Sequence, residues 1–420
     1  MTNYDVIIVG AGSSGLMAAV SAGKNGAKVL VLEKNKVPGR KLLLSGGGRC
    51  NVTNRTSREN LIQHIPGNGK FLYSALNQFD QEDIVAFFES KGVALKEEDH
   101  GRMFPVTDKA RTILDTLIES LDELQVTIQY KSPVQALLHD DGKIIGIKTE
   151  EGQQIYAKSV VLAVGGRAYP KTGATGDGYA WAKSVGHTIE RLYPTESPLL
   201  SNDGEIKNGS LKGVSLRDVA VTVWEGDVGS KVIVVHHMDM LITHFGYSGP
   251  AILRCSGHVN QYLYQHKKDI CYLSIDLIPR LSHETLREKA EDNRDKQVIT
   301  ILKQWMPERM AQALCDRLSI DSHRAYKQLL HQEVTDLWNI VKTYTITAYG
   351  TQPIEKGFVT GGGVSTKEIE PKTMASKKID GLYFCGEFMD INGYTGGYNI
   401  TAAFVTGTIA GQYAAWNAFE

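Results

Sequence analysis

The sequence is short of the features that mark metalloproteins and membrane proteins. Its five cysteines are odd in number and scattered, without a CxxC pair, which argues against a structural metal or a dithiol redox centre and favours a reducing compartment. The most apolar stretch, residues 400–415, is interrupted by threonines and a glutamine and is shorter than a membrane span. We therefore expect no metal site, no membrane association and a cytoplasmic location.

Neither sign of charge is in excess. The 420 residues include 46 Lys and Arg against 47 Asp and Glu, a formal net charge of −1, so nothing global draws the chain to nucleic acid or to an anionic membrane. No basic segment with a small-residue cleavage site precedes the first apolar run, so we expect no signal peptide. The near-zero net charge favours a small-molecule substrate over nucleic acid. The sequence does not indicate the oligomeric state.

The first 34 residues carry a dinucleotide-binding pattern. An apolar run over 6–9 ends in the glycines of GAGSSG, a helical stretch rich in small residues follows, and a second apolar run ends at Glu33. Gly10 makes the turn, Gly12 lets the backbone approach a pyrophosphate, and Gly15 allows close packing of helix on strand. Glu33 lies at the spacing from which a carboxylate accepts hydrogen bonds from ribose hydroxyls.

A second glycine loop, SGGGRCN over 45–51, follows the cations Arg40 and Lys41 and includes Arg49. Three consecutive glycines make a poor helix or strand but a good backbone cradle for a large planar or anionic ligand. We favour a cradle over a flexible linker because linkers rarely carry so many fixed donors. Within the loop, Cys50 is either a thiol at the ligand or a small buried hydrophobe.

Periodicity outlines the next elements. Helical spacing covers 79–91 and 107–121, and 126–161 changes to β-rich runs with Asp-Asp-Gly and Glu-Glu-Gly turns. We read a three-stranded meander that feeds a final strand over 159–164. A glycine-rich segment over 172–178 then precedes a helix for which Asp177 is a plausible N-cap.

The sequence pattern changes after about residue 190, and a pattern like that of the first part returns near the end of the chain. Short β-like runs reach to about 276, and a charged stretch with helical spacing follows. A further glycine loop covers 356–364, and a buried strand over 382–385 ends at Gly386 and Glu387. The segment 392–399 then leads into a C-terminal helix, whose start can face a second part of the same ligand.

Three of these motifs together resemble those of the glutathione-reductase-like flavoproteins: the opening fingerprint, the end of the meander over 161–166, and the late strand over 381–387. The resemblance implies one non-covalently bound FAD. It places Glu387 near the ribityl-phosphate side and points the start of the last helix, 396–400, at the pyrimidine edge of the flavin. A helix N-terminus there stabilises the negative charge of a reduced flavin.

More narrowly, the segments 39–54, 101–110, 243–253 and 396–404 resemble the BaiN-like or YhiN-like bacterial flavoproteins, which are described as aminoacetone oxidases or dehydro-bile-acid reductases. That family implies an α/β fold: a Rossmann-type FAD domain, with a parallel sheet and a three-stranded β-meander, interrupted by an insert with a β-rich, barrel-like part and a small helical part. The expected domains are an FAD-binding domain in two segments, 1–190 and 352–420, and an insert over 191–351, β-rich over 191–276 and 336–351 and helical over 277–335.

The residues expected to hold FAD come from these motifs. They are Gly10, Gly12, Ser14, Gly15, Glu33, Lys34, Arg40, Lys41, Ser45, Gly46, Gly47, Gly48, Arg49, Cys50, Asn51, Val134, Ala163, Val164, Gly165, Gly166, Gly386, Glu387, Gly396, Gly397, Tyr398, Asn399 and Ile400.

The catalytic residues are not identified by the sequence. His244 is either a proton donor to substrate or a residue that fixes its own loop, and the second is favoured because no paired carboxylate is visible. Tyr394 and Tyr398 either line the flavin face or pack as aromatics.

The expected function is an FAD-dependent oxidoreductase that transfers hydride to or from flavin on a small organic substrate. An FAD-dependent RNA-modifying protein and a redox-controlled flavin-binding protein are the alternatives. Oxidase and NAD(P)H-dependent reductase stay open. Because there is no second nucleotide fingerprint, NAD(P)H would dock transiently at the flavin face.

Overall fold

The computed structural model describes residues 4–420, which form two units. Unit 1 runs to Tyr193 and resumes at Val359, and unit 2 is Pro194–Phe358. Each unit has its own hydrophobic core. The unit boundaries thus lie close to the expected limits of the insert, 191 and 351. Within residues 4–420, no helix combines the length and apolar character needed to cross a bilayer.

A parallel sheet forms the centre of unit 1. Its strands lie in the order β6-β2-β1-β9-β19, and all neighbours are parallel. The apolar run of β1 is buried from Val6 to Val9, as expected for a strand covered on both faces. The strands are β1 (Tyr4–Val9), β2 (Val29–Leu32), β6 (Thr127–Gln129), β9 (Gln154–Leu162) and β19 (Leu382–Phe384).

The meander consists of β7 (Val134–Asp140), β8 (Lys143–Thr149) and β9, joined by antiparallel pairing. The strand predicted over 159–164 is not a separate element. Its residues up to Leu162 form the second half of β9. Gln154 to Tyr156 pair with β8, whereas Ala157 to Leu162 pair with β1. The alternating run continues into the fully buried run without a turn residue, so one strand serves both pairings.

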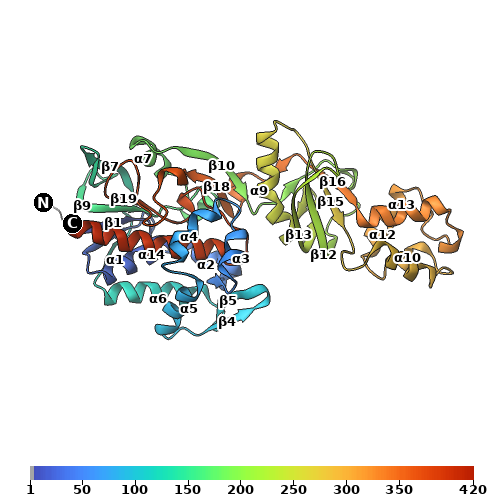
Figure 1. The fold of residues 1–420 in the computed structure, drawn as a ribbon, viewed down its shortest axis with the longest axis horizontal. Helices are drawn as coiled ribbons and strands as arrows, with labels where there is room; N and C mark the ends of the chain where they lie inside the picture. Colours follow the sequence, from blue (N-terminus) through green and yellow to red (C-terminus); the bar gives the residue numbers. More distant parts are fainter. Residues whose placement is uncertain (1–3) are drawn as a thin grey trace. The chain divides into compact units, whose positions relative to one another are not determined.

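Two helices from opposite ends of the chain pack closely beside this sheet. They are α1 (Ser13–Lys24) and α14 (Tyr398–Phe419), drawn side by side in blue and red in Figure 1. A Cβ on Gly407 would lie 2.3 Å from the Ser14 carbonyl oxygen, and one on Gly411 would lie 2.1 Å from that of Ala18. Only glycine permits this approach, and it joins the two segments of unit 1.

Unit 1 also contains a small antiparallel sheet of order β3-β5-β4, against which α5 and α6 pack. Helices α5 and α6 occupy the stretches predicted over 79–91 and 107–121. Asp80 caps α5, since its carboxylate accepts hydrogen bonds from the N–H groups of Glu82 and Asp83. The bounds are β3 (Thr53–Asn54), β4 (Leu95–Glu98), β5 (Arg102–Pro105), α2 (Arg40–Leu44), α3 (Arg58–Gln63), α4 (Tyr73–Leu76), α5 (Gln81–Ser90), α6 (Ala110–Glu123) and α7 (Gly178–Ser184).

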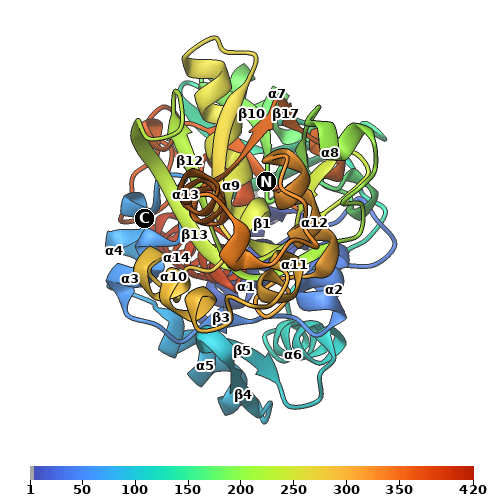
Figure 2. The ribbon, with the colours of Figure 1, turned by 90° about the vertical axis from the view of Figure 1, so that its right-hand side faces the viewer.

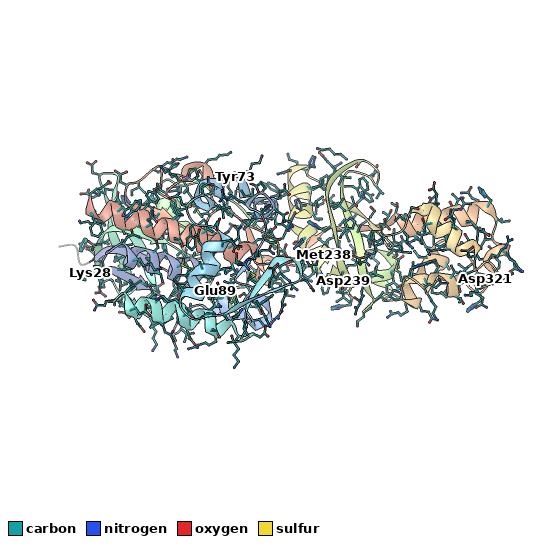
Figure 3. The ribbon with its side chains drawn as sticks, turned by 60° about the horizontal axis from the view of Figure 1, so that its bottom comes forward. Lys28, Tyr73, Glu89, Met238, Asp239 and Asp321 are labelled. Carbon is teal, nitrogen blue, oxygen red and sulfur yellow. The ribbon has the colours of Figure 1, made fainter. Side chains whose placement is uncertain are left out.

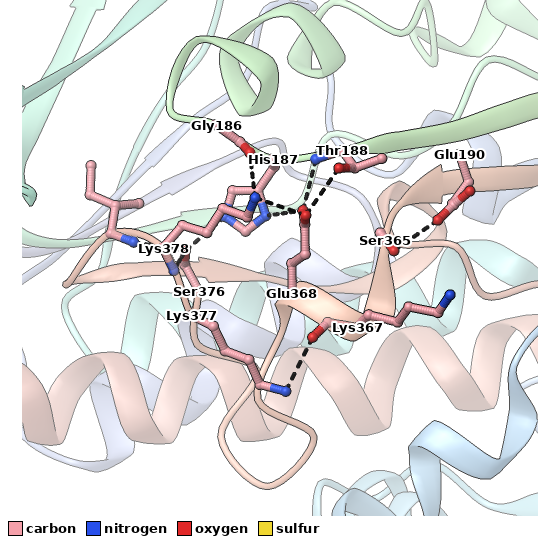
Figure 4. Close-up of polar contacts among 11 residues, drawn as sticks. Gly186, His187, Thr188, Glu190, Ser365, Lys367, Glu368, Ser376, Lys377 and Lys378 are labelled. Atoms are coloured by element: carbon pink, nitrogen blue, oxygen red, sulfur yellow. Dashed lines mark hydrogen bonds and ion pairs between the residues drawn. The ribbon is translucent and has the colours of Figure 1, made fainter.

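A two-stranded ribbon, β10 (Ile189–Thr195) with β18 (Val359–Val364), lies where the chain leaves and re-enters unit 1. Glu368 fixes the start of this ribbon (Figure 4): it accepts hydrogen bonds from the Thr188 N–H at 2.7 Å and the Thr188 hydroxyl at 3.0 Å, and pairs with Lys378 at 2.8 Å. The buried His187 contacts Ser376 through Nε2 at 2.7 Å and lies 3.4 Å from Glu368 through Nδ1.

Unit 2 contains a seven-stranded sheet of order β16-β15-β12-β13-β14-β11-β17. Its edge strands, β16 and β17, are separated in the chain by Tyr349 alone, so the two edges of the sheet meet and the sheet curves like a barrel. The strands are β11 (Leu199–Leu200), β12 (Ser215–Glu225), β13 (Lys231–Ile242), β14 (Gly246–Ser248), β15 (Cys271–Asp276), β16 (Tyr344–Ala348) and β17 (Gly350–Thr351).

The long hairpin of β12 and β13 shows how the sheet is shaped. Met238 and Asp239, adjacent on β13 and labelled in Figure 3, differ in exposure: Met238 packs against the core and Asp239 is exposed. The Asp239 carboxylate accepts a hydrogen bond at 2.8 Å from the N–H of Asp218, where the register shifts between Leu216 and Val219. This bulge bends the strand.

Helix α9 (Pro250–Gln265) packs against β12 and β13, although the stretch 191–276 was expected to be β-rich. Pro250 occupies the first turn, directly after Gly249 with φ of 89°, a favourable helix start. The buried Ile252, Cys255 and Val259 recur at three- and four-residue spacing. This period is helical and was missed among the short β-like runs around it.

A helical part completes unit 2. Helices α10 to α13 lie close together in Figure 2, and the indole N–H of the buried Trp338 donates to the Tyr326 hydroxyl at 2.9 Å. Helix α13 extends to Lys342, past the expected helical limit of 335. The bounds are α8 (Gly204–Lys207), α10 (His283–Glu291), α11 (Val298–Leu302), α12 (Glu308–Arg317) and α13 (His331–Lys342).

The helix contact predicts a strong effect of a single side chain. Gly411→Val should destabilise unit 1 by about 2 to 3 kcal/mol, because the new side chain overlaps the Ala18 carbonyl. Urea unfolding measures this. Gly204→Val is the control, since a Cβ there meets no atom within 4 Å; equal stability of the two variants would contradict the prediction.

Acid should weaken the Glu368 cluster. Partial burial raises the pKa of Glu368, but hydrogen bonds from Lys378 and Thr188 outweigh it and lower the pKa from 4.5 to about 2. The ionised group therefore contributes stability above pH 4.5 that is lost as the pH falls towards 2. Burial also lowers the pKa of His187, so charging that ring below pH 6.5 costs stability in the same direction.

Glu368→Gln should thus cost roughly 1 to 2 kcal/mol at pH 7, and wild type and variant should converge near pH 2 to 3. Urea unfolding at several pH values measures both, with Glu119→Gln on the exposed face of α6 as control. A difference that is constant with pH would show that the carboxylate charge is not responsible.

Candidate functional site

The opening glycines divide into packing positions and an open position. A Cβ on Gly10 would lie 2.6 Å from the Ala163 carbonyl oxygen, and one on Gly15 only 1.9 Å from that of Gly10. A Cβ on Gly12 would meet no atom within 4 Å. Gly12 is the N-cap of α1 and has no side chain with which to cap it. The helix N-terminus therefore faces open space through its backbone, as an anion site requires.

Glu33 closes this site at the end of β2. It is 7% exposed, and its Oε2 accepts a hydrogen bond from the Ala11 N–H at 2.9 Å. Its Oε1 accepts from the backbone and side-chain N–H groups of Asn35 at 2.8 and 2.6 Å. A carboxylate has about four acceptor positions, so the group is oriented and still has capacity for a ribose hydroxyl.

The predicted cations Lys34 and Arg40 act through neighbouring residues. Lys34 pairs with Asp177 at 2.6 Å, so Asp177 anchors the glycine-rich segment 172–178. Asp177 occupies the predicted N-cap position of α7, but its side chain makes no capping hydrogen bond. Arg40 donates to the Asn35 side-chain oxygen at 2.7 Å and thereby braces the partner of Glu33. Val134 starts β7, two residues after Ser132, whose N–H donates to the Glu33 carbonyl oxygen at 3.0 Å.

Segments from distant parts of the chain meet at Glu387. Its Oε2 pairs with Lys41 at 2.6 Å, and its Oε1 accepts from the Thr360 N–H at 2.7 Å. The Thr360 hydroxyl accepts from the N–H groups of Arg167 and Ala168, both at 2.9 Å. The 165–168 turn, the late strand and α2 are thus joined around one carboxylate.

Other predicted residues serve the close approach of backbones. A Cβ on Gly166 would lie 2.2 Å from the Thr360 hydroxyl oxygen, and one on Gly386 would lie 2.5 Å from that of Ser14. Gly165 has φ of 69°. The side chain of Val164 packs beside Gly178, where a Cβ would come within 2.5 Å of it.

The second glycine loop adopts left-handed backbone angles and has open space beside it. Gly46 and Gly47 have φ of 56° and 68°, and a Cβ on Gly47 would meet no atom within 4 Å. The loop ends at Asn51, whose side-chain oxygen is buried and has no hydrogen-bond partner among residues 4–420. A buried acceptor beside an open glycine loop fits a ligand N–H, such as that on a flavin pyrimidine ring.

The start of α14 lies against Asn51. A Cβ on Gly397, which has φ of 98°, would come within 3.0 Å of the Asn51 oxygen. Asn54 donates to the Gly396 carbonyl at 2.9 Å. Gly397 is the N-cap and cannot cap with a side chain, so the first-turn N–H groups of Tyr398, Asn399 and Ile400 form the positive end of the helix.

The side chains around this helix start hold the loop. Asn399 accepts from the Gly393 N–H at 2.8 Å and donates to the Gly393 carbonyl at 2.7 Å. Tyr398 stacks on His64 with ring centroids 4.6 Å apart, and Tyr394 meets His64 edge-on at 6.1 Å. His244 lies in unit 2, edge-on to Phe245 at 4.9 Å.

Three predicted residues of the second loop have contacts that favour a supporting role. Burial raises the pKa of the Cys50 thiol to about 12, so this cysteine is a protonated, small hydrophobe. Arg49 pairs with Glu98 at 2.8 Å and with Asp108 at 3.3 Å. The Ser45 hydroxyl donates to the Leu42 carbonyl at 2.6 Å.

Sequence reasoning missed Asn35, Asn54 and Thr360, which orient Glu33, Gly396 and Glu387. Asn35 stands two positions after Glu33, which was a usable signal. Thr360 and Asn54 reach the site only through the fold. No group of three or more His, Cys, Asp or Glu within residues 4–420 has the arrangement of a metal site.

Comparison with known proteins gives full-length matches. A family model described as HI0933-like protein Rossmann domain matches residues 4–413. The chain is 32% identical over 412 residues to the ribosomal RNA dihydrouridine synthase of Escherichia coli, covering 96% of each chain. It is 30% identical over 416 residues to the 3-dehydro-bile acid delta(4,6)-reductase of Clostridium scindens, covering 97% of this chain and 98% of that one.

Solved structures share the fold. The 3-ketosteroid delta1-dehydrogenase of Sterolibacterium denitrificans superposes with a TM-score of 0.51 at 14% identity, covering 98% of this chain and 99% of that one. Mycobacterium smegmatis Sdh1 gives a TM-score of 0.51 at 18% identity, covering 99% of this chain and 69% of that one.

Loss of the Glu33 charge should weaken FAD binding. Glu33→Gln should raise the dissociation constant of the apoprotein for FAD by roughly 10- to 100-fold, because it removes a charge-assisted acceptor and loosens the turn at Ala11. Flavin fluorescence quenching measures this, with Glu151→Gln, on an exposed turn, as control. Unchanged affinity in a folded variant would mean that Glu33 is not at the ribose.

Proposed function

The chain belongs to the HI0933-like family of FAD-binding oxidoreductases, and we propose that it reduces a carbon–carbon double bond conjugated with a carbonyl group. The observation that carries this proposal is the chemistry shared by two full-length relatives that are named for different substrates. Dihydrouridine arises by saturation of the uracil ring, whose double bond is conjugated with a carbonyl. The delta(4,6) bonds of a 3-dehydro-bile acid are conjugated with its 3-oxo group.

Reduction of such a bond needs a hydride at the carbon distant from the carbonyl and a proton at the adjacent carbon. Reduced FAD, when bound, supplies the hydride. The residues described above fit this cofactor in two regions. Glu33 and the start of α1 suit the adenosine and the pyrophosphate, and the open glycine loop with the buried Asn51 oxygen suits the ring system.

The chain's own residues contribute orientation and charge. The N-terminus of α14 has no acidic residue in its first turn, so its dipole would stabilise negative charge on a flavin bound there. Lys41 is held by Glu387 at 2.6 Å and lies beside the turn that Thr360 joins to that carboxylate. Contacts of this kind fix the orientation of a site, and fixed orientation favours hydride transfer.

A uridine of ribosomal RNA is the first substrate to test. Besides the Escherichia coli protein, the ribosomal RNA dihydrouridine synthase of Haemophilus influenzae is 30% identical over 408 residues, covering 96% of this chain and 97% of that one. Two full-length relatives thus carry that name. The flavin would take its electrons from NAD(P)H docked transiently.

A small conjugated ketone is the second candidate, and charge favours it. In the helical part of unit 2, several cations are already paired with acids: Arg280, Lys303, Arg317, Arg324, Lys327 and Lys342. Paired cations release few counterions on binding phosphates, so these six cations contribute little electrostatic affinity for RNA.

The two substrates are separated by one anaerobic experiment. FAD-loaded protein is reduced with NADH or NADPH, and an unmodified ribosomal RNA transcript or 4-androstene-3,17-dione is then added. We expect flavin bleaching by NAD(P)H and reoxidation by the true substrate, with a mass gain of two hydrogens in the product. The apoprotein is the control. Bleaching by an amine alone, followed by fast reoxidation with oxygen, would show an oxidase and refute the proposal.

A further inference from the structure

We propose that Arg49 positions the glycine loop Ser45–Gly48 for FAD without contacting the cofactor, and that Glu98 and Asp108 hold Arg49 in place. The sequence pattern alone predicts that Arg49 contacts the cofactor. The proposal rests on FAD binding by the family and is independent of which substrate the enzyme reduces.

The Arg49 guanidinium is held from several sides. It forms a two-pronged pair with Glu98, from Nη1 at 2.8 Å and from Nη2 at 3.2 Å, and Nη1 also reaches Asp108 at 3.3 Å. Its carbon lies 4.1 Å from the centroid of the Phe104 ring. Paired planar hydrogen bonds and stacking on an aromatic face fix orientation as well as position.

The two carboxylates are themselves fixed. Lys96 pairs with Asp108 at 2.6 Å and lies 3.7 Å from Glu98. Hydrogen bonding from Arg49 lowers the pKa of Glu98, and hydrogen bonding from Lys96 lowers the pKa of Asp108. Both groups are therefore ionised at neutral pH. We call Arg49, Glu98 and Asp108 the clamp. Glu98 ends β4 and Asp108 follows β5, so the two carboxylates of the clamp belong to the small sheet and not to the glycine loop.

The loop needs such a clamp. Consecutive glycines have the largest conformational freedom of any residue, and Gly46 and Gly47 adopt left-handed φ angles. The Phe104 ring supports the loop directly, because its Cε1 atom would lie 3.1 Å from a Cβ on Gly46. Phe104 thus lies against both Gly46 and Arg49. Because Arg49 holds this ring in place, it also restricts the glycine loop that packs on the ring.

The position of Arg49 also explains why it is not a ligand contact. The N–H groups of both Nη atoms are directed to carboxylates, and the guanidinium plane lies against Phe104. The Asn51 oxygen, two residues further on, is a buried acceptor that lacks a partner among the described residues. The loop therefore turns its backbone and Asn51 to the ligand, and Arg49 to the small sheet.

The exposure of the clamp separates its role from general stability. The side chains of Arg49, Glu98 and Asp108 are 35%, 27% and 43% exposed, and ion pairs of this exposure contribute little to folding. Loss of the clamp should therefore leave the thermal stability of the apoprotein nearly unchanged. It should weaken FAD binding, because the cofactor must then order a mobile loop.

The test is a double-mutant cycle on the full chain with Arg49→Ala, Glu98→Gln and both together. We expect each single variant to weaken FAD binding roughly three- to tenfold. The double variant should bind FAD at least as tightly as the single variant with the lower affinity, because the two residues act as one unit. The apoprotein melting temperatures should agree within about 2 °C. Glu82→Gln, which removes the exposed pair with Arg55, is the matched control and should leave affinity within roughly twofold of wild type.

Two results would overturn the proposal. If Arg49→Ala weakens FAD binding far more than Glu98→Gln and the two effects multiply, Arg49 contacts FAD itself. If neither variant changes the affinity, the clamp does not position the loop. Should Arg49→Ala fail to fold, Glu98→Gln and Asp108→Asn give the same comparison. A wild-type protein that binds FAD but reduces no conjugated substrate would refute the proposed reaction and leave this inference intact.

Discussion

The close contact between α1 and α14 is the constraint on which unit 1 depends. Gly407 and Gly411 let the last helix lie directly on the carbonyl oxygens of Ser14 and Ala18, and the Ser21 hydroxyl donates to the Thr408 carbonyl at 2.7 Å. This contact keeps the chain's last segment on its first. Together with the packing of α14 on β9, it places the N-termini of α1 and α14 in the same unit.

Within that frame, charged side chains mostly orient one another. Lys41 is paired with Glu387, Lys34 with Asp177 and Arg49 with Glu98, at 2.6, 2.6 and 2.8 Å. The groups with open capacity are backbone N–H groups, the Glu33 carboxylate and the Asn51 oxygen. A site of fixed dipoles and oriented charges is suited to a cofactor that gains and loses negative charge, because little has to reorganise when the charge changes.

The insertion of unit 2 is compatible with this site because both crossings of the chain lie on one paired ribbon. β10 and β18 are neighbours, and Glu368 ties the start of β10 to the segment that follows β18. The end of the first segment and the start of the last are thereby held together within unit 1.

The sequence by itself determined the features that depend on near neighbours. The β1-turn-α1-β2 pattern, the glycine loop and the helix predicted over 107–121 were readable, because periodicity and the φ angles of glycine are local properties. The tertiary structure alone decided the partners, since Lys41 and Glu387 are 346 residues apart and Arg49 and Glu98 are 49 apart. The tertiary structure also showed that the strand predicted over 159–164 is part of β9, and that Asp177 pairs with Lys34. Charge pairing depends on distance in space, which no spacing along the chain specifies.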